Sequence, residues 1–284
     1  MRRAAALIAL AFLVEARPAE AMVIHEMSDR MPLPGHFELE TLGSYASYDL
    51  TVIDGTVFAT NPTSSSYRDI SLATALEMGV APDTSVSLQV PASMLRKFDN
   101  SAPTKGLGDV DLGFARRAYD NGWFSWKSRI LAELPTGSNT VGGGISALGL
   151  DNIFKFDLFH KALTLTTNAN YLYRLRSTEV DPATNLFITS WPGQRAEMNF
   201  GLEWHASPTF SMIAELLSHW DSNQEANRQG VPNTGDTCVG IAPGFTWTLS
   251  PHVSWLGSVS FPLLRGGYQA SYRIGGTTGL VMPF

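Results

Sequence analysis

The sequence predicts an all-β fold, a transmembrane up-and-down antiparallel β-barrel of about twelve strands. Apolar and polar residues alternate in strand-length runs to the end of the chain, and the links between the runs are tight and long in turn. An export signal precedes these runs. Because lipid-facing and lumen-facing side chains alternate along the strands of an outer-membrane barrel, the three observations together favour that fold.

The first 21 residues predict a signal peptide. Arg2 and Arg3 precede an apolar run over residues 4–14, and Ala19-Glu20-Ala21 offers small residues around a cleavage site. This run is too short to cross a bilayer, and no later stretch approaches the ~20 uninterrupted apolar residues of a membrane-spanning helix. Any membrane span must therefore consist of strands.

The rest of the chain is expected to form one barrel domain over residues 37–284, after a periplasmic lead-in over residues 22–36. Charged residues make up 16% of the chain and aromatic residues 11%, which suits a lipid-facing barrel. The net charge of -6 is mild and argues against a nucleic-acid partner, which would need a basic stripe. We expect no cofactor. We also expect no metal site: His25, Met27 and Met31 are residue types that bind soft metals, but their spacing in a flexible segment does not define a ligand set.

Residues 196–206 show the alternation most clearly. One face carries Met198, Phe200, Leu202 and Trp204, and the other carries Glu197, Asn199, Gly201, Glu203 and His205. A half-buried strand of a soluble protein also alternates. It rarely needs a solid apolar face on strand after strand with so few charges on that face, so the lipid interpretation is favoured.

Comparable runs predict the other strands in order. A Thr/Ser/Asn/Pro-rich loop up to Tyr67 follows the first strand, and Ala81-Pro82-Asp83 turns the second strand into the third. Turn residues of the same kinds, such as Asp120-Asn121-Gly122, separate the later runs. The predicted strands lie near residues 37–48, 70–78, 86–90, 109–114, 124–134, 147–158, 162–174, 196–206, 210–216, 239–247, 253–261 and 268–284.

The links sort into two classes that alternate along the chain. The five tight turns lie near residues 81–83, 120–122, 159–161, 207–209 and 250–252, and the six longer links near 49–67, 92–105, 136–146, 175–195, 221–236 and 264–267. Barrels of this kind have short periplasmic turns and long outer loops. With both termini on the tight-turn side, every longer link is expected at the cell exterior.

Phe284 closes the chain after Leu280 and Met282, which keep the alternation. A terminal aromatic residue in this setting is the usual form of the signal that the barrel-assembly machinery reads. That machinery and outer-membrane lipid are therefore expected partners, and the expected location is the outer membrane of a Gram-negative bacterium. Pro283 departs from the pattern because it removes a backbone donor at the strand end.

The middle of the chain resembles a known family. Gly106-Leu107-Gly108-Asp109-Val110-Asp111-Leu112-Gly113, followed by Leu131-Ala132-Glu133-Leu134-Pro135-Thr136-Gly137, is similar to the outer-membrane proteins related to the meta-pathway of phenol degradation. Ala242-Pro243-Gly244-Phe245 and Val259-Ser260-Phe261-Pro262-Leu263 look like closing strands of the same group. The resemblance implies a barrel that transports hydrophobic or aromatic compounds, and it implies no functional residue individually.

The polar side chains expected to face the lumen are the main candidates for a functional site. They are Glu77, Gln89, Asp109, Asp111, Lys127, Arg129, Glu133, Asn168, Asn170, Glu197, Asn199, Glu203, Glu215 and Arg273. Charges in a narrow barrel must pair or stay hydrated, because an isolated ion in a dry interior is costly. The set is compatible with a selectivity lining around a passage and equally with a plug of mutually paired charges.

Aromatic residues on the predicted outward faces are expected to anchor the barrel at the lipid interfaces. They are Trp126, Trp204, Trp220, Trp247, Trp255, Tyr171, Tyr173 and Tyr272. Phe187 and Trp191 differ because they lie in a predicted outer loop. Apolar groups on such a loop are candidates for capping the mouth or for contacting a hydrophobic ligand.

The function favoured by the sequence is an outer-membrane channel for small, hydrophobic or aromatic molecules, without covalent chemistry. An outer-membrane lipid hydrolase using His219 and Ser222 is one alternative. The odd spacing of the two residues opposes it, because they would face opposite sides of a continuous strand. A structural or adhesion barrel is the other alternative.

Overall fold

The computed structural model describes residues 31–49, 52–53, 56–57, 66–98, 104–137, 146–180, 187–191, 193–223, 225–226, 229–230, 235–267 and 271–284. The predicted signal peptide, most of the lead-in and residues 138–145 lie outside the described residues. The side chains of Phe187, Tyr272 and Arg273 are also outside the described part.

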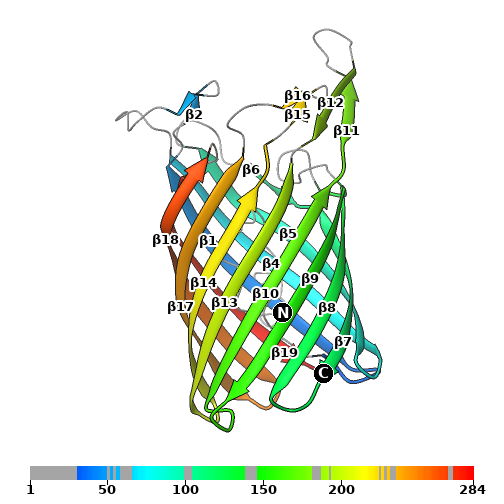
Figure 1. Ribbon diagram of the computed structural model, residues 1–284, viewed down its shortest axis with the longest axis vertical. Coiled ribbons are helices and arrows are strands. Elements are labelled where there is room, and N and C mark those ends of the chain that lie inside the picture. The colour runs from blue at the N-terminus through cyan, green and yellow to red at the C-terminus, as the bar shows by residue number, and fades with distance from the viewer. Residues whose placement is uncertain are drawn as a thin grey trace, which may run out of the picture.

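Twelve antiparallel strands close into a barrel, which confirms the predicted fold class (Figure 1). Each strand pairs with its sequence neighbours in the ring, and β1 pairs with β19 to close it. The strands of the ring are β1 (Phe37–Asp49), β4 (Ser66–Ala81), β5 (Thr84–Phe98), β7 (Val110–Asp120), β8 (Phe124–Leu134), β9 (Ala147–Leu158), β10 (Leu163–Arg174), β13 (Gln194–Ser207), β14 (Phe210–Asp221), β17 (Asp236–Ser250), β18 (Val253–Gly267) and β19 (Ser271–Pro283).

The two ends of the barrel sequence meet at the closing seam. The backbone N–H of Phe37 donates to the carbonyl oxygen of Phe284 at 3.1 Å, and the N–H of Phe284 donates back at 2.7 Å. Gly35 just before the seam donates to the carbonyl of Gly79 on β4. The chain therefore enters and leaves the barrel at the same rim, which is also the rim of the tight turns (Figure 1).

Short strands cover the opposite rim. β11 (Ser177–Val180), β12 (Phe187–Trp191), β15 (Glu225–Ala226) and β16 (Gln229–Gly230) form a small separate sheet, and β2 (Val52–Ile53) pairs with β3 (Thr56–Val57). Figure 1 shows β2, β11 and β12 beyond this rim of the barrel. The longer links thus share one rim, as the alternation of link lengths predicts.

Five predicted links are corrected by the structure. β2 and β3 form a hairpin within the expected 49–67 loop. β5 runs on to Phe98 and β6 (Thr104–Leu107) pairs with it, where residues 92–105 were expected to form a linker. β11 and β12 form a hairpin within the expected 175–195 loop, β15 and β16 form another within 221–236, and residues 264–267 continue β18. Polar sequence misled the prediction here, because a strand that extends beyond the lipid has no need for an apolar face.

β6 and β7 are two halves of one interrupted strand, since both pair with β5. Gly108 and Asp109 separate them, and the N–H of Gly108 donates to the carbonyl of Pro91 at 2.7 Å. The buried Asp109 carboxylate accepts the N–H of Gly137 at 2.8 Å. The predicted lumen residue Asp109 therefore fixes the link after β8 to the interruption.

The barrel wall separates two kinds of surface. On β13, Leu202 is 43% exposed on the outer face, whereas Asn199 on the inner face is 3% exposed. Outward side chains such as Trp126, Trp204 and Trp247 are also exposed. The outer surface is thus apolar and aromatic, and most charged side chains of the strands point inward.

Candidate functional site

The lumen wall gathers the predicted polar residues because the strand register places them side by side. Arg129 pairs with Asp151, which pairs in turn with Asn170, and Asn168 pairs with Asn199. Every predicted lumen residue with a described side chain is buried or half-buried. Polar residues alternate with apolar ones along each strand, and the register aligns the polar positions of neighbouring strands. They form a continuous polar wall over β8, β9, β10 and β13.

Asp151 is the centre of this wall, and its side chain is 0% exposed. Its carboxylate accepts hydrogen bonds from Arg129 Nε at 3.1 Å and from Nη2 at 2.8 Å. The Asn168 amide nitrogen donates to the other carboxylate oxygen. A buried carboxylate is tolerable only with such partners. The sequence prediction missed Asp151, although its spacing from Leu148 and Leu150 places it on the inner face.

Lys127 extends from β8 past two strands toward β4. Its ammonium nitrogen lies 3.4 Å from a Glu77 carboxylate oxygen, which also accepts a hydrogen bond from Ser85. The intervening β5 and β7 carry small inward residues there, and a Cβ on Gly113 would lie only 2.2 Å from the Ser87 hydroxyl oxygen. The small side chains leave the space through which Lys127 and Glu77 meet.

A narrow cavity of about 30 Å³ lies beside these charges. Its lining includes Glu40, Glu77, Asp111, Arg129 and Leu42. A space of this size holds only one or two water molecules. The acidic side chains come from β1, β4 and β7, and the Arg129 guanidinium faces them from β8. Opposite charges from neighbouring strands therefore meet around this cavity.

Asp221 organises the lumen at the long-loop rim. Arg195 donates to both of its carboxylate oxygens, with Nη2 at 2.7 Å, and Arg174 Nη1 donates at 3.0 Å. Glu197 lies 3.7 Å from the Arg195 guanidinium. The sequence prediction assigned Asp221 and Arg195 to loops and so missed this pair. The structure shows that β13 and β14 extend far enough to bring them into register.

Trp191 is attached to the same rim. Its indole N–H donates to the carbonyl of Arg174 at 2.7 Å, and the Arg176 guanidinium lies 5.7 Å from its ring centroid. The tryptophan thereby links the short sheet at the mouth to the end of β10. Phe187 belongs to β12 as well, but its side chain lies outside the described residues.

A wider cavity of about 450 Å³ opens at the tight-turn rim. A chain of hydrogen bonds crosses its wall: Thr164 donates to Asp157 at 3.0 Å, and His205 contacts Thr164 and Ser211 at 3.0 and 2.8 Å. Glu203 and Glu215, both predicted lumen residues, line the same cavity. This cavity is large enough for a small organic molecule.

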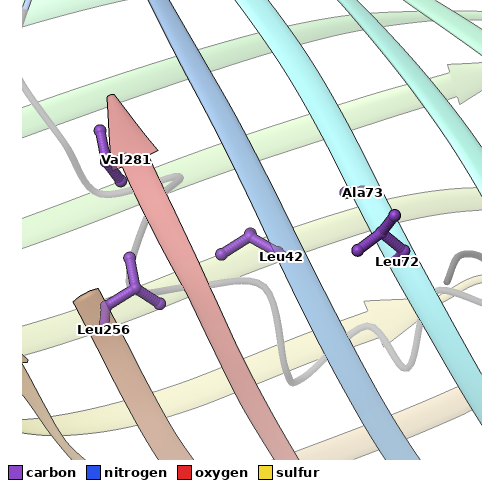
Figure 2. Packing of buried hydrophobic residues seen from close by; sticks show 5 residues of the cluster. All are labelled: Leu42, Leu72, Ala73, Leu256 and Val281. Carbon is purple, nitrogen blue, oxygen red and sulfur yellow. The ribbon is translucent and has the colours of Figure 1, made fainter. Parts of the chain in front are cut away.

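An apolar row runs along the wall between the two cavities. Leu256, Gly279, Leu42 and Ala73 are successive register partners across β18, β19, β1 and β4. Leu256 and Val281 line the wide cavity, while Leu42 and Ala73 line the narrow one. Figure 2 shows these four residues together with Leu72. The sequence prediction considered only polar residues for the lumen and missed this row.

His219 and Ser222 occupy separate environments. His219 is buried on the inner face of β14, in register with Glu197 and Cys238. Ser222 follows the end of β14, and its hydroxyl oxygen accepts the N–H of Gln194 at 2.8 Å. Its own N–H donates to the Gln194 carbonyl at 2.9 Å. Ser222 thus extends the pairing between β13 and β14 at the rim.

Two features are absent from the described residues. In that part of the chain, no helix is long and apolar enough to cross a membrane. No group of three or more His, Cys, Asp or Glu side chains there is arranged to hold a metal ion.

The chain is similar in fold to solved outer-membrane barrels. An outer membrane channel from Pseudomonas putida F1 matches with a TM-score of 0.75 and 10% identity, over 95% of this chain and 100% of that chain. The beta domain of the Bordetella autotransporter Brka matches with a TM-score of 0.52 and 9% identity, over 88% and 100%. The NanC porin matches with a TM-score of 0.50 and 10% identity, over 85% and 98%.

At such identities the likeness shows the shared barrel fold. No family model and no curated protein matches the chain. The resemblance to proteins related to the meta-pathway of phenol degradation therefore stays a prediction.

Proposed function

We propose that this protein is an outer-membrane channel that moves small hydrophobic or aromatic molecules by facilitated diffusion. The apolar row in the lumen is the observation that carries the proposal. If the lumenal side chains served only the stability of the barrel, charged pairs could fill the lumen throughout. Instead, Leu42, Leu256 and Val281 place hydrocarbon between the two lumenal cavities. A hydrophobic solute in either cavity can contact this row, whose side chains are buried between them.

The outer surface supports a location in the outer membrane. Exposed apolar side chains such as Leu112, Phe114 and Met212 need an apolar solvent, and the closed strand ladder leaves no backbone edge for the lipid to solvate. The tight-turn rim, with both ends of the barrel, faces the periplasm in this proposal. The long-loop rim with Trp191 then faces the cell exterior.

The proposal involves no covalent step. The lumenal charges form ion pairs that stabilise the inner surface of the barrel. Asp151 binds Arg129, and Asp221 binds Arg195 and Arg174. We assign these pairs to the shape and polarity of the passage. Phe284, hydrogen-bonded at the seam, remains the candidate contact for the barrel-assembly machinery.

Uptake by cells tests the proposal. Gram-negative cells that produce the protein should take up labelled toluene faster than cells without it, and the purified protein should conduct ions in planar bilayers. Leu256→Asn should slow toluene uptake severalfold with little effect on ion conductance. The matched exposed variant Leu263→Asn, on the outer side of β18, should leave uptake unchanged. Equal uptake with and without the protein would overturn the proposal.

A further inference from the structure

We propose that the wide cavity at the tight-turn rim binds the ammonium group of a small amphipathic amine between Glu203 and Glu215. The inference rests on the proposed channel function and names a solute class for it. Glu215 differs in its partners from Asp151 and Asp221, which are buried acids bound by arginine.

Glu215 is 4% exposed and lines the cavity from β14. Among the residues that the structure describes, no side chain or backbone group forms a hydrogen bond or ion pair with its carboxylate. Asp151 and Asp221, at comparable burial, are each bound by arginine. A buried carboxylate without a partner is costly, and a cation that reaches it through the cavity removes part of that cost.

Glu203 provides a second carboxylate beside it. Gly201 is the register partner of Glu215, so Glu203 is its diagonal neighbour across β13 and β14. The same cavity is lined by both glutamates. Diagonal neighbours of this kind lie ~7–8 Å apart at their Cα atoms, which places one ammonium within reach of both side chains.

His205 lies beside Glu203 but is held by other partners. Its Nδ1 lies 3.6 Å from Glu203, but both ring nitrogens already have hydroxyl partners. Because the Thr164 hydroxyl donates to Asp157, its oxygen accepts from Nε2–H of His205. Nδ1 lies 2.8 Å from the Ser211 hydroxyl oxygen. Both ring nitrogens thus have hydrogen-bond partners other than the two glutamates.

The charge of the cavity wall favours a cation. Four carboxylates, those of Glu38, Asp157, Glu203 and Glu215, line it with the ammonium groups of Lys155 and Lys161. Both lysines lie near Asp157, at 3.6 and 3.7 Å. The wall around Glu203 and Glu215 is therefore negative, and field lines concentrate in a low-dielectric cavity.

The rest of the wall favours an organic cation. Ile213, Leu256 and Val281 line the cavity and offer hydrocarbon contact. A bare metal ion would gain nothing from these side chains. An amine with an alkyl or aryl group would place its N–H donors at the glutamates and its hydrocarbon on the apolar row.

Block of the ion current in planar bilayers tests this site, with benzylammonium chloride as the probe and benzyl alcohol as its neutral counterpart. We expect benzylammonium to block the wild-type current at much lower concentration than benzyl alcohol. Glu215→Gln should raise the half-blocking concentration of benzylammonium about tenfold, which corresponds to ~1.4 kcal/mol. Glu203→Gln should raise it at least about threefold, and block by benzyl alcohol should stay the same.

Glu133→Gln is the matched control, because Glu133 lies near the other end of the lumen on β8 and should leave the block unchanged. Heat-dependent migration on gels checks folding, and Glu203→Gln decides the question if Glu215→Gln does not fold. Unchanged block in the glutamate variants of a conducting channel would overturn the amine site and leave the channel proposal intact. A wild-type protein that passes no current would instead overturn the channel proposal.

Discussion

Lys127 on β8 places its ammonium nitrogen 3.4 Å from the carboxylate of Glu77 on β4, although β5 and β7 lie between these strands. The pair is a strut across part of the lumen, next to the narrow cavity. It reaches across a wider part of the lumen than a pair on adjacent strands, because both side chains extend inward from separated strands.

Removing the strut is expected to widen the passage. Lys127→Ala should raise single-channel conductance and lower the free energy of unfolding by up to about 3 kcal/mol, since Glu77 loses a buried cationic partner. Lys161→Ala is the control, because Lys161 is 69% exposed and 3.7 Å from Asp157. Bilayer recordings and urea unfolding measure the two effects. Unchanged conductance in Lys127→Ala would show that the strut does not limit flow.

Adjacent residues on β13 test the two faces of the wall. Leu202→Arg should lower the free energy of unfolding in lipid by about 2 to 4 kcal/mol, because it places a charge on the lipid-facing side. Glu203→Arg should cost much less, since its side chain lies in the lumen. Unfolding in lipid vesicles compares them. Equal losses in the two variants would contradict the assigned faces.

The arginine pair at the long-loop rim depends on Asp221. Asp221→Asn should lower the free energy of unfolding by roughly 3 kcal/mol, because the two guanidinium groups lose their shared carboxylate. Glu197→Gln should have a smaller effect, since Glu197 lies 3.7 Å from the Arg195 guanidinium, whereas Arg195 Nη2 donates to Asp221 at 2.7 Å. Chemical denaturation in detergent gives both values. A larger loss in Glu197→Gln would reverse the assigned importance of the two acids.

Gly279 is required by the close approach of Leu42. A Cβ at this position would lie 2.4 Å from the Thr41 carbonyl oxygen and 2.5 Å from Leu42 Cδ2. Gly279→Val should therefore reduce the folded fraction strongly, as heat-dependent gel migration would show. Gly43→Ala is the control, because its nearest atom would be 3.6 Å away. Normal folding of Gly279→Val would mean that β1 and β19 separate easily.

Ser222→Ala separates the hydrolase alternative from the channel. We expect no change in lipid composition of the outer membrane, because the Ser222 hydroxyl accepts the N–H of Gln194 as part of the rim pairing. Mass spectrometry of lipid A and phospholipids from producing cells measures it. Fatty-acid release that disappears in Ser222→Ala would establish the hydrolase.

The strands were predictable where one face meets an apolar solvent. The bounds Phe124–Leu134 and Ala147–Leu158 agree with the prediction to the residue. Alternation was informative there because most outward positions are apolar, with Ser128 and Asn152 as the polar exceptions. Alternation did not predict β6 or the end of β18, because the strands there do not need an apolar outer face.

The site was less predictable than the fold. Single-strand alternation placed Lys127 and Glu215 on the inner face, but it gave no information on which residues meet across the lumen. The strut to Glu77 depends on small residues of two other strands, and the row through Leu42 and Leu256 depends on register. Both require knowing which strands are neighbours and how they are aligned.

The seam between Phe37 and Phe284 has a consequence for biosynthesis. Its two hydrogen bonds join residues from opposite ends of the barrel sequence, and the pairing continues along β1 and β19, so the ring stays open until β19 is in place. A prematurely terminated product would keep an unsatisfied edge on β1 and could not be completed by any local rearrangement. Proteases can therefore distinguish closed from unclosed barrels, since only a polypeptide that contains both β1 and β19 pairs both edges.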